Sequence, residues 1–290
     1  MSSKSRLEEI IKSIENLPPF PEVARRILEL AEALDAGPND TLDIIQYDQA
    51  ITANCLRVCN SSYFGLPVKI FAIDQAVRML GLQNIIKIVL ANFKGLSPYK
   101  KAYKGYGLNS GELWRHSVGC ATLSQILLCK AGLQKDSVLF TAALLHDVGK
   151  LVLDRYVAEN YEEITCLVKK NGLSFVEAEK GILGIDHAEA GGIIAQTWDF
   201  PLSLTNSIRN HHESMTGKVI PNLEAWVRLS NLVYHVSPPH LLCSHREGIT
   251  CKVDQAILFQ FGFKQEDINE ILDALPAEMR EAEEMLKVTI

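Results

Sequence analysis

Residues 138–153 read VLFTAALLHDVGKLVL. Apolar side chains fill 140–145 and return at 151–153, with spacings of three and four that predict a helix with a buried face. An imidazole and a carboxylate, His146 and Asp147, follow the apolar run directly. The stretch therefore predicts one helix over 138–153 that carries an adjacent His and Asp at its buried inner end.

The same periodicity recurs along most of the chain. It predicts helices over 7–14, 23–34, 50–59, 85–93, 113–128, 188–198 and 223–236, and a final amphipathic segment over 264–287. No stretch alternates apolar and polar residues between turn signals, as a strand would. The fold class predicted is all-α.

Helix-breaking residues divide the chain. Proline and glycine gather at 17–21, at 65–67 and across 95–111. They predict a two-lobed helical bundle. Its parts are an N-terminal lobe over 1–96, a linker over 97–110, a second lobe over 111–236 and a C-terminal helical extension over 237–290.

Composition limits the partners. The 290 residues include 29 Lys and Arg against 35 Asp and Glu, a formal net charge of -6 that repels nucleic acid and anionic lipid. Seven cysteines without a CxxC pair favour a reducing compartment, and no apolar run is long enough to cross a membrane. We expect a cytoplasmic protein with no membrane partner.

One segment has a local basic and aromatic character. Four lysines and three tyrosines alternate there, at Lys94, Lys100, Lys101, Lys104, Tyr99, Tyr103 and Tyr106. Such a composition could stack on single-stranded nucleic acid, but a solvated loop between two lobes explains it equally. Because the chain is acidic overall, the solvated loop is favoured and a nucleic-acid partner is disfavoured.

The candidate site residues lie in the second lobe. They are His116, His146, Asp147, His187, His211 and His212. A single His on an apolar helix is usually a hydrogen-bonded core residue, but the set together predicts one pocket for a divalent transition metal such as Fe, Mn, Zn or Ni. Lys150 is a candidate phosphate contact. Cys55 and Cys59 are interpreted as core residues.

These motifs resemble those of a known superfamily. The residues at 116–117, 146–150, 187–189 and 211–213 are similar, in order, to the ligand motifs of the HD superfamily of metal-dependent phosphohydrolases. The first part, at 17–21, 48–52, 56–57, 60–65 and 76–81, resembles the HDOD domain, the HD-related output domain of bacterial signalling proteins. The resemblance implies an HD-like second lobe and a signalling module that is usually non-catalytic.

Two departures from the catalytic relatives bear on activity. Asn231 stands where those relatives carry a final Asp ligand, which leaves Asp147 as the one carboxylate at a matched ligand position. Two divalent ions would then face a single fixed negative charge, so one ion is expected. The Gly-Tyr-Pro motif of cyclic-di-GMP hydrolases is also missing after Glu213.

Three functions stay open, and the least favoured is nucleic-acid binding through residues 94–106. The favoured one is a bacterial signalling or regulatory module that is non-catalytic and acts by binding a signalling protein partner or a nucleotide or phosphate ligand. The alternative is a metal-dependent phosphohydrolase of the HD superfamily that cleaves a nucleotide or another phosphoester.

Overall fold

The computed structural model describes residues 46–47, 49–60, 65–81, 102–215, 220–237 and 253–285. The regular elements in these ranges are helices, and the extended contact found among them is an isolated bridge between Tyr103 and Leu108. The predicted all-α class is therefore confirmed. The helices expected over 7–14, 23–34 and 85–93 lie outside the described residues, as does most of the lobe over 1–96, so the domain boundaries stay predictions.

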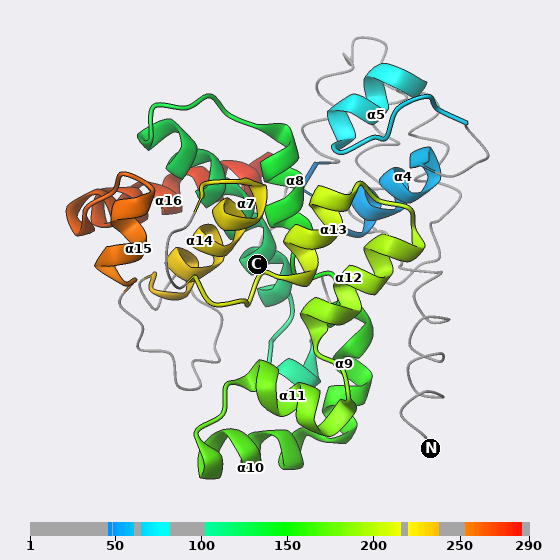
Figure 1. Cartoon of the computed structure of the whole chain (residues 1–290), viewed down its shortest axis with the longest axis vertical. Coiled ribbons are helices and arrows are strands. Elements are labelled where there is room, and N and C mark those ends of the chain that lie inside the picture. The colour runs from blue at the N-terminus through cyan, green and yellow to red at the C-terminus, as the bar shows by residue number, and fades with distance from the viewer. Residues whose placement is uncertain are drawn as a thin grey trace.

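The helices form a bundle around one long central helix (Figure 1). In chain order they are α4 Gln49–Asn60, α5 Ile73–Leu80, the 3-10 turn η1 Lys104–Tyr106, α7 Glu112–Lys130, α8 Ser137–Leu145, α9 Lys150–Glu159, α10 Tyr161–Asn171, α11 Phe175–Leu183, α12 His187–Thr197, α13 Leu202–Arg209, α14 Leu223–His235, α15 Gln255–Gln260 and α16 Gln265–Met285. Periodicity predicted α4, α7, α12, α14 and α16, but it missed short helices such as α5, α10 and α13.

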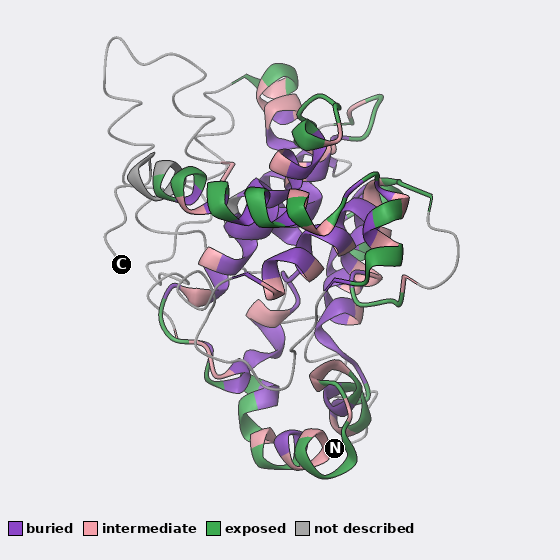
Figure 2. Ribbon diagram, turned by 90° about the vertical axis from the view of Figure 1, so that its left-hand side faces the viewer, coloured by how far each residue is buried: buried purple, intermediate pink, exposed green. Residues whose placement is uncertain are grey.

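Helix α7 is buried along most of its length and packs against α8, α14 and α16. Gly119 permits the close crossing of α7 and α14, because a Cβ there would lie 2.1 Å from Cε2 of Tyr234. Lys130 pairs with Glu270 of α16 at the far end of α7. The apolar core runs through these helices, while the outer helices show their exposed faces in Figure 2.

The turn between α7 and α8 is held by side chains. Asp136 caps α8 by accepting from the backbone N–H groups of Val138 and Leu139. Gln125 of α7 accepts from the backbone N–H of Asp136 at 2.8 Å and donates to its carbonyl at 3.1 Å. These bonds fix the register of α8 against α7. They therefore also fix the position of His146, which directly follows α8.

The prediction of one helix over 138–153 is wrong, because the chain breaks into α8 and α9. Residues 146–149 form a tight turn in which the Val148 N–H donates to Leu145 O and the Lys150 N–H donates to Asp147 O. At Gly149 a Cβ would lie 1.9 Å from the carbonyl oxygen of His187. The close approach of α12 therefore requires glycine at position 149, and the turn places His146 and Asp147 in the interior.

Two long-range hydrogen bonds connect the first part of the chain to α8 and α7. Gln49 Nε2 of α4 donates to the Leu144 carbonyl at 2.8 Å, and Trp114 Nε1 of α7 donates to the Tyr47 carbonyl at 3.0 Å. Cys55 and Cys59 of α4 are fully buried and belong to the hydrophobic core. Their interpretation as core residues agrees with this position.

The expected solvated loop is wrong for the described part of the linker, 102–110. Tyr103 is 3% exposed and Tyr106 is 8% exposed, and both belong to the core. Gly105 donates its backbone N–H to Asp154 of α9 at 2.9 Å. These tyrosines are not available to stack on nucleic acid, and Lys94, Tyr99, Lys100 and Lys101 lie outside the described residues.

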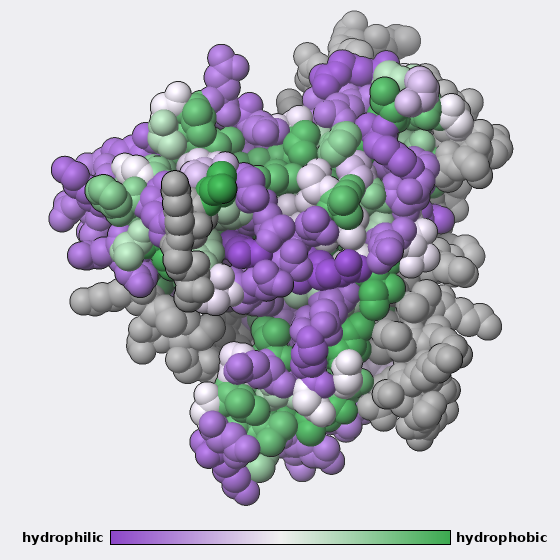
Figure 3. Space-filling model, viewed as in Figure 1, coloured by the Kyte–Doolittle hydropathy of each residue, from purple (hydrophilic) through white to green (hydrophobic). Residues whose placement is uncertain are grey.

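The outer surface is mixed in character. Figure 3 shows hydrophilic residues across the middle of this face and a mixture of hydrophobic and hydrophilic residues toward its lower end, over α10 and α11. Among the ranges given above, no helix combines the length and apolar character needed to cross a membrane.

Candidate metal centre

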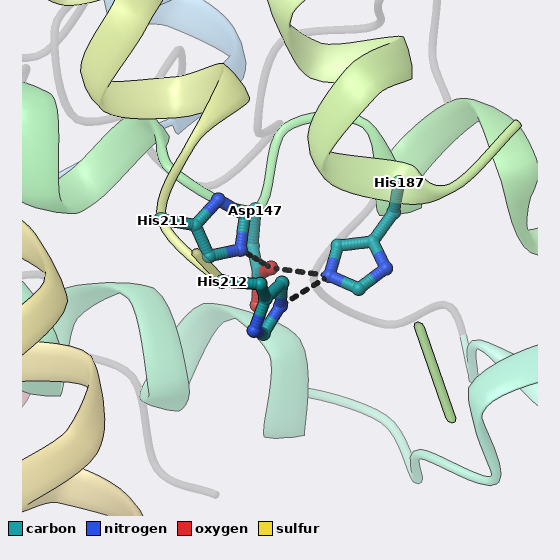
Figure 4. A group of neighbouring side chains, drawn as sticks. All are labelled: Asp147, His187, His211 and His212. Atoms are coloured by element: carbon teal, nitrogen blue, oxygen red, sulfur yellow. Dashed lines mark hydrogen bonds and ion pairs between the residues drawn. The ribbon is translucent and has the colours of Figure 1, made fainter. Parts of the chain in front are cut away.

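Asp147 lies at the centre of a cluster of imidazoles supplied by separate helices. His116 comes from α7 and His187 begins α12, whereas His211 and His212 follow the end of α13. The side chains of His187, His211 and His212 point toward the Asp147 carboxylate (Figure 4). All six residues singled out in the sequence therefore converge, and the ring centroids of His146 and His211 are 4.8 Å apart.

One oxygen of Asp147 faces the imidazoles of the later helices. Asp147 Oδ1 lies 3.4 Å from His187 Nε2 and 3.5 Å from His211 Nε2. His187 Nε2 is 2.9 Å from His212 Nε2. The ligand atoms of these four residues all lie within 4.8 Å of one another, and all but His212 are buried.

The other oxygen faces the imidazoles nearer α7. Asp147 Oδ2 lies 3.2 Å from His116 Nε2 and 3.5 Å from His146 Nε2, and the two Nε2 atoms are 3.1 Å apart. Lys150 Nζ donates to the same oxygen at 2.7 Å. The candidate phosphate contact is therefore already paired with Asp147.

In three of the histidine rings, Nδ1 lies within hydrogen-bond distance of an oxygen acceptor. His146 Nδ1 is 2.6 Å from the Ala143 carbonyl and His211 Nδ1 is 2.7 Å from the Ile208 carbonyl. His187 Nδ1 is 2.7 Å from Glu179 Oε2. Since carbonyl and carboxylate oxygens accept, each Nδ1 donates, and wherever such a ring is neutral its Nε2 presents a lone pair to the pocket.

These lone pairs face a carboxylate oxygen that also only accepts. Neither Asp147 Oδ1 nor His211 Nε2 has a hydrogen-bond partner among the described residues. Buried acceptors that face one another are unfavourable unless a cation lies among them. Bonds of about 2.0–2.2 Å to a transition metal place neighbouring ligand atoms about 3–3.5 Å apart, so the separations here fit such an ion.

Two residues that the sequence reasoning missed hold His187 in place. Glu179 of α11 is fully buried, and its Oε2 also accepts from the His187 backbone N–H at 2.9 Å. Tyr106 OH donates to Glu179 Oε1 at 2.5 Å, and burial beside Glu179 holds the pKa of Tyr106 well above its usual range. A Glu eight residues before a predicted ligand gave no recognisable signal in the sequence.

Cys120 and His235 were also missed. Cys120 lies one helical turn after His116, and its Sγ is 3.8 Å from His116 Nε2. The ring of His235, at the end of α14, is 5.2 Å from that of His116, and burial lowers the pKa of His235 to about 3. Asn231 of α14 is buried, and its Oδ1 lies 4.0 Å from Cys120 Sγ.

The charges in the pocket are set by burial and by neighbours. Burial alone would raise the pKa of the Asp147 carboxyl, but the Lys150 ammonium beside it holds that pKa well below its usual range. Burial lowers the pKa of His116 and His211, and lowers that of His146 most. At neutral pH the pocket therefore combines a carboxylate with neutral imidazoles at His116, His146 and His211, the protonation states that a metal ion requires.

We expect the metal-free chain to lose stability as the pH falls below about 6.5, the ordinary pKa of His. His116, His146 and His211 have lowered pKa values when folded, so the unfolded chain binds more protons over this interval. Each contributes up to about 1.4 kcal/mol per pH unit. Urea unfolding with a chelator present, from pH 7.5 to pH 5, measures this loss, and a constant free energy of unfolding would contradict it.

The fold and the pocket define an all-helical protein with a buried, imidazole-rich site suited to a metal cation. A family model described as the HDOD domain matches residues 17–214. The chain belongs to the HDOD domain family. The match ends before Asn231, so the place of Asn231 among the family's ligand positions stays a prediction.

Known proteins of similar sequence or structure agree with this fold. An uncharacterized protein of Treponema pallidum is 24% identical over 206 residues, which cover 70% of this chain and 39% of that protein. The structure of a virulence factor from Campylobacter jejuni has a TM-score of 0.68 at 23% identity and covers 96% of both chains. The MmoQ response regulator of Methylococcus capsulatus has a TM-score of 0.67 at 21% identity and covers 89% of this chain and 98% of its own.

Proposed function

We propose that this chain is a bacterial signalling regulator that binds one divalent transition metal through Asp147, His187, His211 and His212 and does not hydrolyse phosphoesters. The metal holds the ends of α8, α12 and α13 together, and a signalling protein partner recognises the resulting arrangement of helices. The observation that carries the proposal is the pair of buried atoms, Asp147 Oδ1 and His211 Nε2, that lie 3.5 Å apart without a hydrogen-bond partner among the described residues, with His187 Nε2 3.4 Å from the same oxygen.

The type of metal follows from the donor atoms. Three imidazole nitrogens and one carboxylate oxygen suit Fe, Mn, Zn or Ni, whereas Ca and Mg prefer shells of oxygen. The imidazoles of His187 and His211 are each oriented by an acceptor behind the ring, as is usual for histidine ligands. The chemistry supplied by such an ion is the attraction of anionic groups, including phosphate, to the pocket.

The charge balance supports a single ion at this site. Asp147 and Glu179 are the two carboxylates in the cluster, and Lys150 pairs with Asp147. One divalent ion would leave the buried cluster with a single net positive charge. A second ion without another anionic ligand would add two more, at a high cost in desolvation and repulsion.

The lack of hydrolysis follows from the residues available to a substrate. Asn231 supplies a neutral amide on α14, where the catalytic relatives are expected to carry a carboxylate. Lys150 pairs with Asp147 Oδ2 at 2.7 Å and is mostly covered, so it is not poised to receive a phosphate. Both features favour a site that binds a metal ion without hydrolysing a phosphoester.

A route from the pocket to the first part of the chain supports a regulatory role. Tyr106, in the segment that enters the second lobe, donates to Glu179, which in turn holds His187. Gln49 of α4 donates to the Leu144 carbonyl, two residues before His146. A change in the position of His187 or His146 would therefore alter contacts made by the first part of the chain.

We expect the purified chain to show no turnover of cyclic dinucleotides or nucleotide phosphodiesters with added Mn or Fe. The variant Asn231→Asp should raise the Mn occupancy of the His116 end of the pocket, because it restores a hard anionic ligand there. Product analysis and elemental analysis of both proteins test this. Rapid turnover by the unchanged chain that is lost in a folded His146→Ala variant would establish the phosphohydrolase instead.

The alternative function, a metal-dependent phosphohydrolase, rests on one specific feature. Lys150 places its ammonium beside Asp147 and 5.6 Å from the centre of the Tyr106 ring, with 16% of its side chain exposed. If a substrate displaced it from Asp147, it would neutralise a phosphate. Under this alternative, Lys150→Met would abolish the turnover measured above, whereas under our proposal there is no turnover to lose.

A further inference from the structure

We propose that Cys120 is a metal ligand and that His116, Cys120 and His146, with Asp147 Oδ2, form a second site selective for a soft divalent ion such as Zn. This thiolate site is distinct from the Asp147, His187, His211 and His212 site. The inference rests on the proposed function to the extent that Asp147 faces both sites.

The positions of the donor atoms carry the inference. His116 Nε2 is 3.1 Å from His146 Nε2, 3.2 Å from Asp147 Oδ2 and 3.8 Å from Cys120 Sγ. A tetrahedral ion with bonds of about 2.0–2.1 Å to nitrogen and oxygen and about 2.3 Å to sulfur requires separations of about 3.3–3.6 Å. The three separations from His116 Nε2 scatter around those values, and the ligand atoms of His116, Cys120 and His146 all lie within 4.8 Å of one another.

The helix geometry explains why these atoms meet. His116 and Cys120 are four residues apart on α7, so both lie on the same face of the helix. His146 is brought to that face by the turn after α8, with its Nδ1 held by the Ala143 carbonyl and its lone pair directed inward. All three side chains are buried and separated from bulk water.

Cys120 can supply the negative charge that the neutral amide of Asn231 lacks. Binding of Zn displaces the thiol proton to solvent, so one S–H bond breaks, one Zn–S bond forms and the site gains one negative charge. That charge takes the place of the carboxylate that Asn231 does not supply. A second divalent ion, unfavourable with imidazoles alone, is then balanced by an anionic ligand of its own.

Asn231 is suited to a thiolate neighbour. The Cys120 thiol donates to Asn231 Oδ1 at 4.0 Å, and rotation of the amide would turn its N–H donors toward the sulfur after the proton leaves. An aspartate at the same position would place a second negative charge beside the thiolate. The pairing of Cys120 with Asn231 therefore favours a soft ion, whereas Asn231→Asp would favour a hard one.

Cobalt substitution tests the thiolate directly. Metal-free full-length protein is titrated with Co²⁺ and followed in the near ultraviolet, where thiolate-to-cobalt charge transfer absorbs. We expect this band in the unchanged chain and in Cys129→Ser, a control on the same helix whose thiol is exposed. In Cys120→Ser the band should vanish and the cobalt affinity of this site should fall by at least about 100-fold.

A second variant separates the two proposals. His212→Ala removes a ligand of the proposed function's site but none of the thiolate site, so it should bind less metal and keep the band. If the unchanged chain binds Co²⁺ without the band, or if the band persists in Cys120→Ser, the Cys120 proposal is overturned and the first site stands. If the unchanged chain binds no Co²⁺, both proposals fail.

A measurement on the unchanged chain covers the case in which Cys120→Ser does not fold. X-ray absorption at the zinc edge of the fully loaded protein should detect a sulfur scatterer at about 2.3 Å. A shell of nitrogen and oxygen alone would overturn the assignment of Cys120.

Discussion

Asp147→Asn should reduce the metal bound by the purified chain from about one ion or more to under about one tenth of an ion, because its carboxylate is the shared anionic ligand. Loss of an outer-shell contact costs about 10- to 100-fold in metal affinity, so loss of this carboxylate should cost at least about 100-fold. Asparagine keeps the volume, and Lys150 can turn toward water. Elemental analysis and titration with Mn²⁺ and Zn²⁺ measure the effect.

The matched control is Asp186→Asn. Asp186 precedes the ligand His187 and caps α12 by accepting from the Glu189 N–H, a role that asparagine performs equally well. This variant should bind metal like the unchanged chain and gain the same thermal stability from it. Equal metal content in the Asp147→Asn protein and the unchanged chain would remove Asp147 from the site.

Gly149→Ala should lower the free energy of unfolding by at least about 3 kcal/mol, the upper end of the usual cost of overpacking. The new Cβ would lie 1.9 Å from the His187 carbonyl oxygen and 2.7 Å from the Gly191 backbone nitrogen. Backbone atoms cannot move aside as a flexible side chain can, so the turn and α12 must separate. Because His187 begins α12, metal affinity should fall as well.

Gly181→Ala provides the comparison for Gly149→Ala. Gly181 lies inside α11, and the nearest atom to its added Cβ is Leu167 Cδ1 at 4.0 Å. Here alanine should stabilise the protein by about 0.5–1 kcal/mol through helix propensity. Chemical denaturation measures both variants. A Gly149→Ala protein as stable as the unchanged chain would contradict the close approach of the turn to α12.

Much of the bundle could be predicted from apolar periodicity, because long helices such as α7 and α14 bury one continuous face. The convergence of the six candidate residues on one pocket could also be predicted, because ordered histidines with an adjacent aspartate lie at the ends or on the faces of the predicted helices. The break between α8 and α9 at Gly149 could not be predicted from the sequence. The turn packs against the backbone of α12, which lies about forty residues further along the chain and meets the turn only in the folded state.

The residues that the sequence reasoning missed depend on tertiary contacts in the same way. Glu179 and Tyr106 are separated by 73 positions, and their hydrogen bond behind His187 has no local signature. Cys120 looks like a small core residue of α7 until the turn after α8 brings His146 beside it. Burial of Tyr103 and Tyr106 contradicts a fully solvated linker, because a pattern of alternating basic and aromatic residues does not show which side chains pack into the core.

The central claim is that the second lobe holds a metal ion against Asp147 Oδ1, His187 Nε2 and His211 Nε2. Anomalous scattering from crystals of the full chain, grown with Mn²⁺ or Zn²⁺ and measured at that metal's absorption edge, tests it most directly. We predict an anomalous peak within bonding distance of all three atoms, about 2.0–2.2 Å. Fully ordered side chains at these positions with no peak among them would contradict the account.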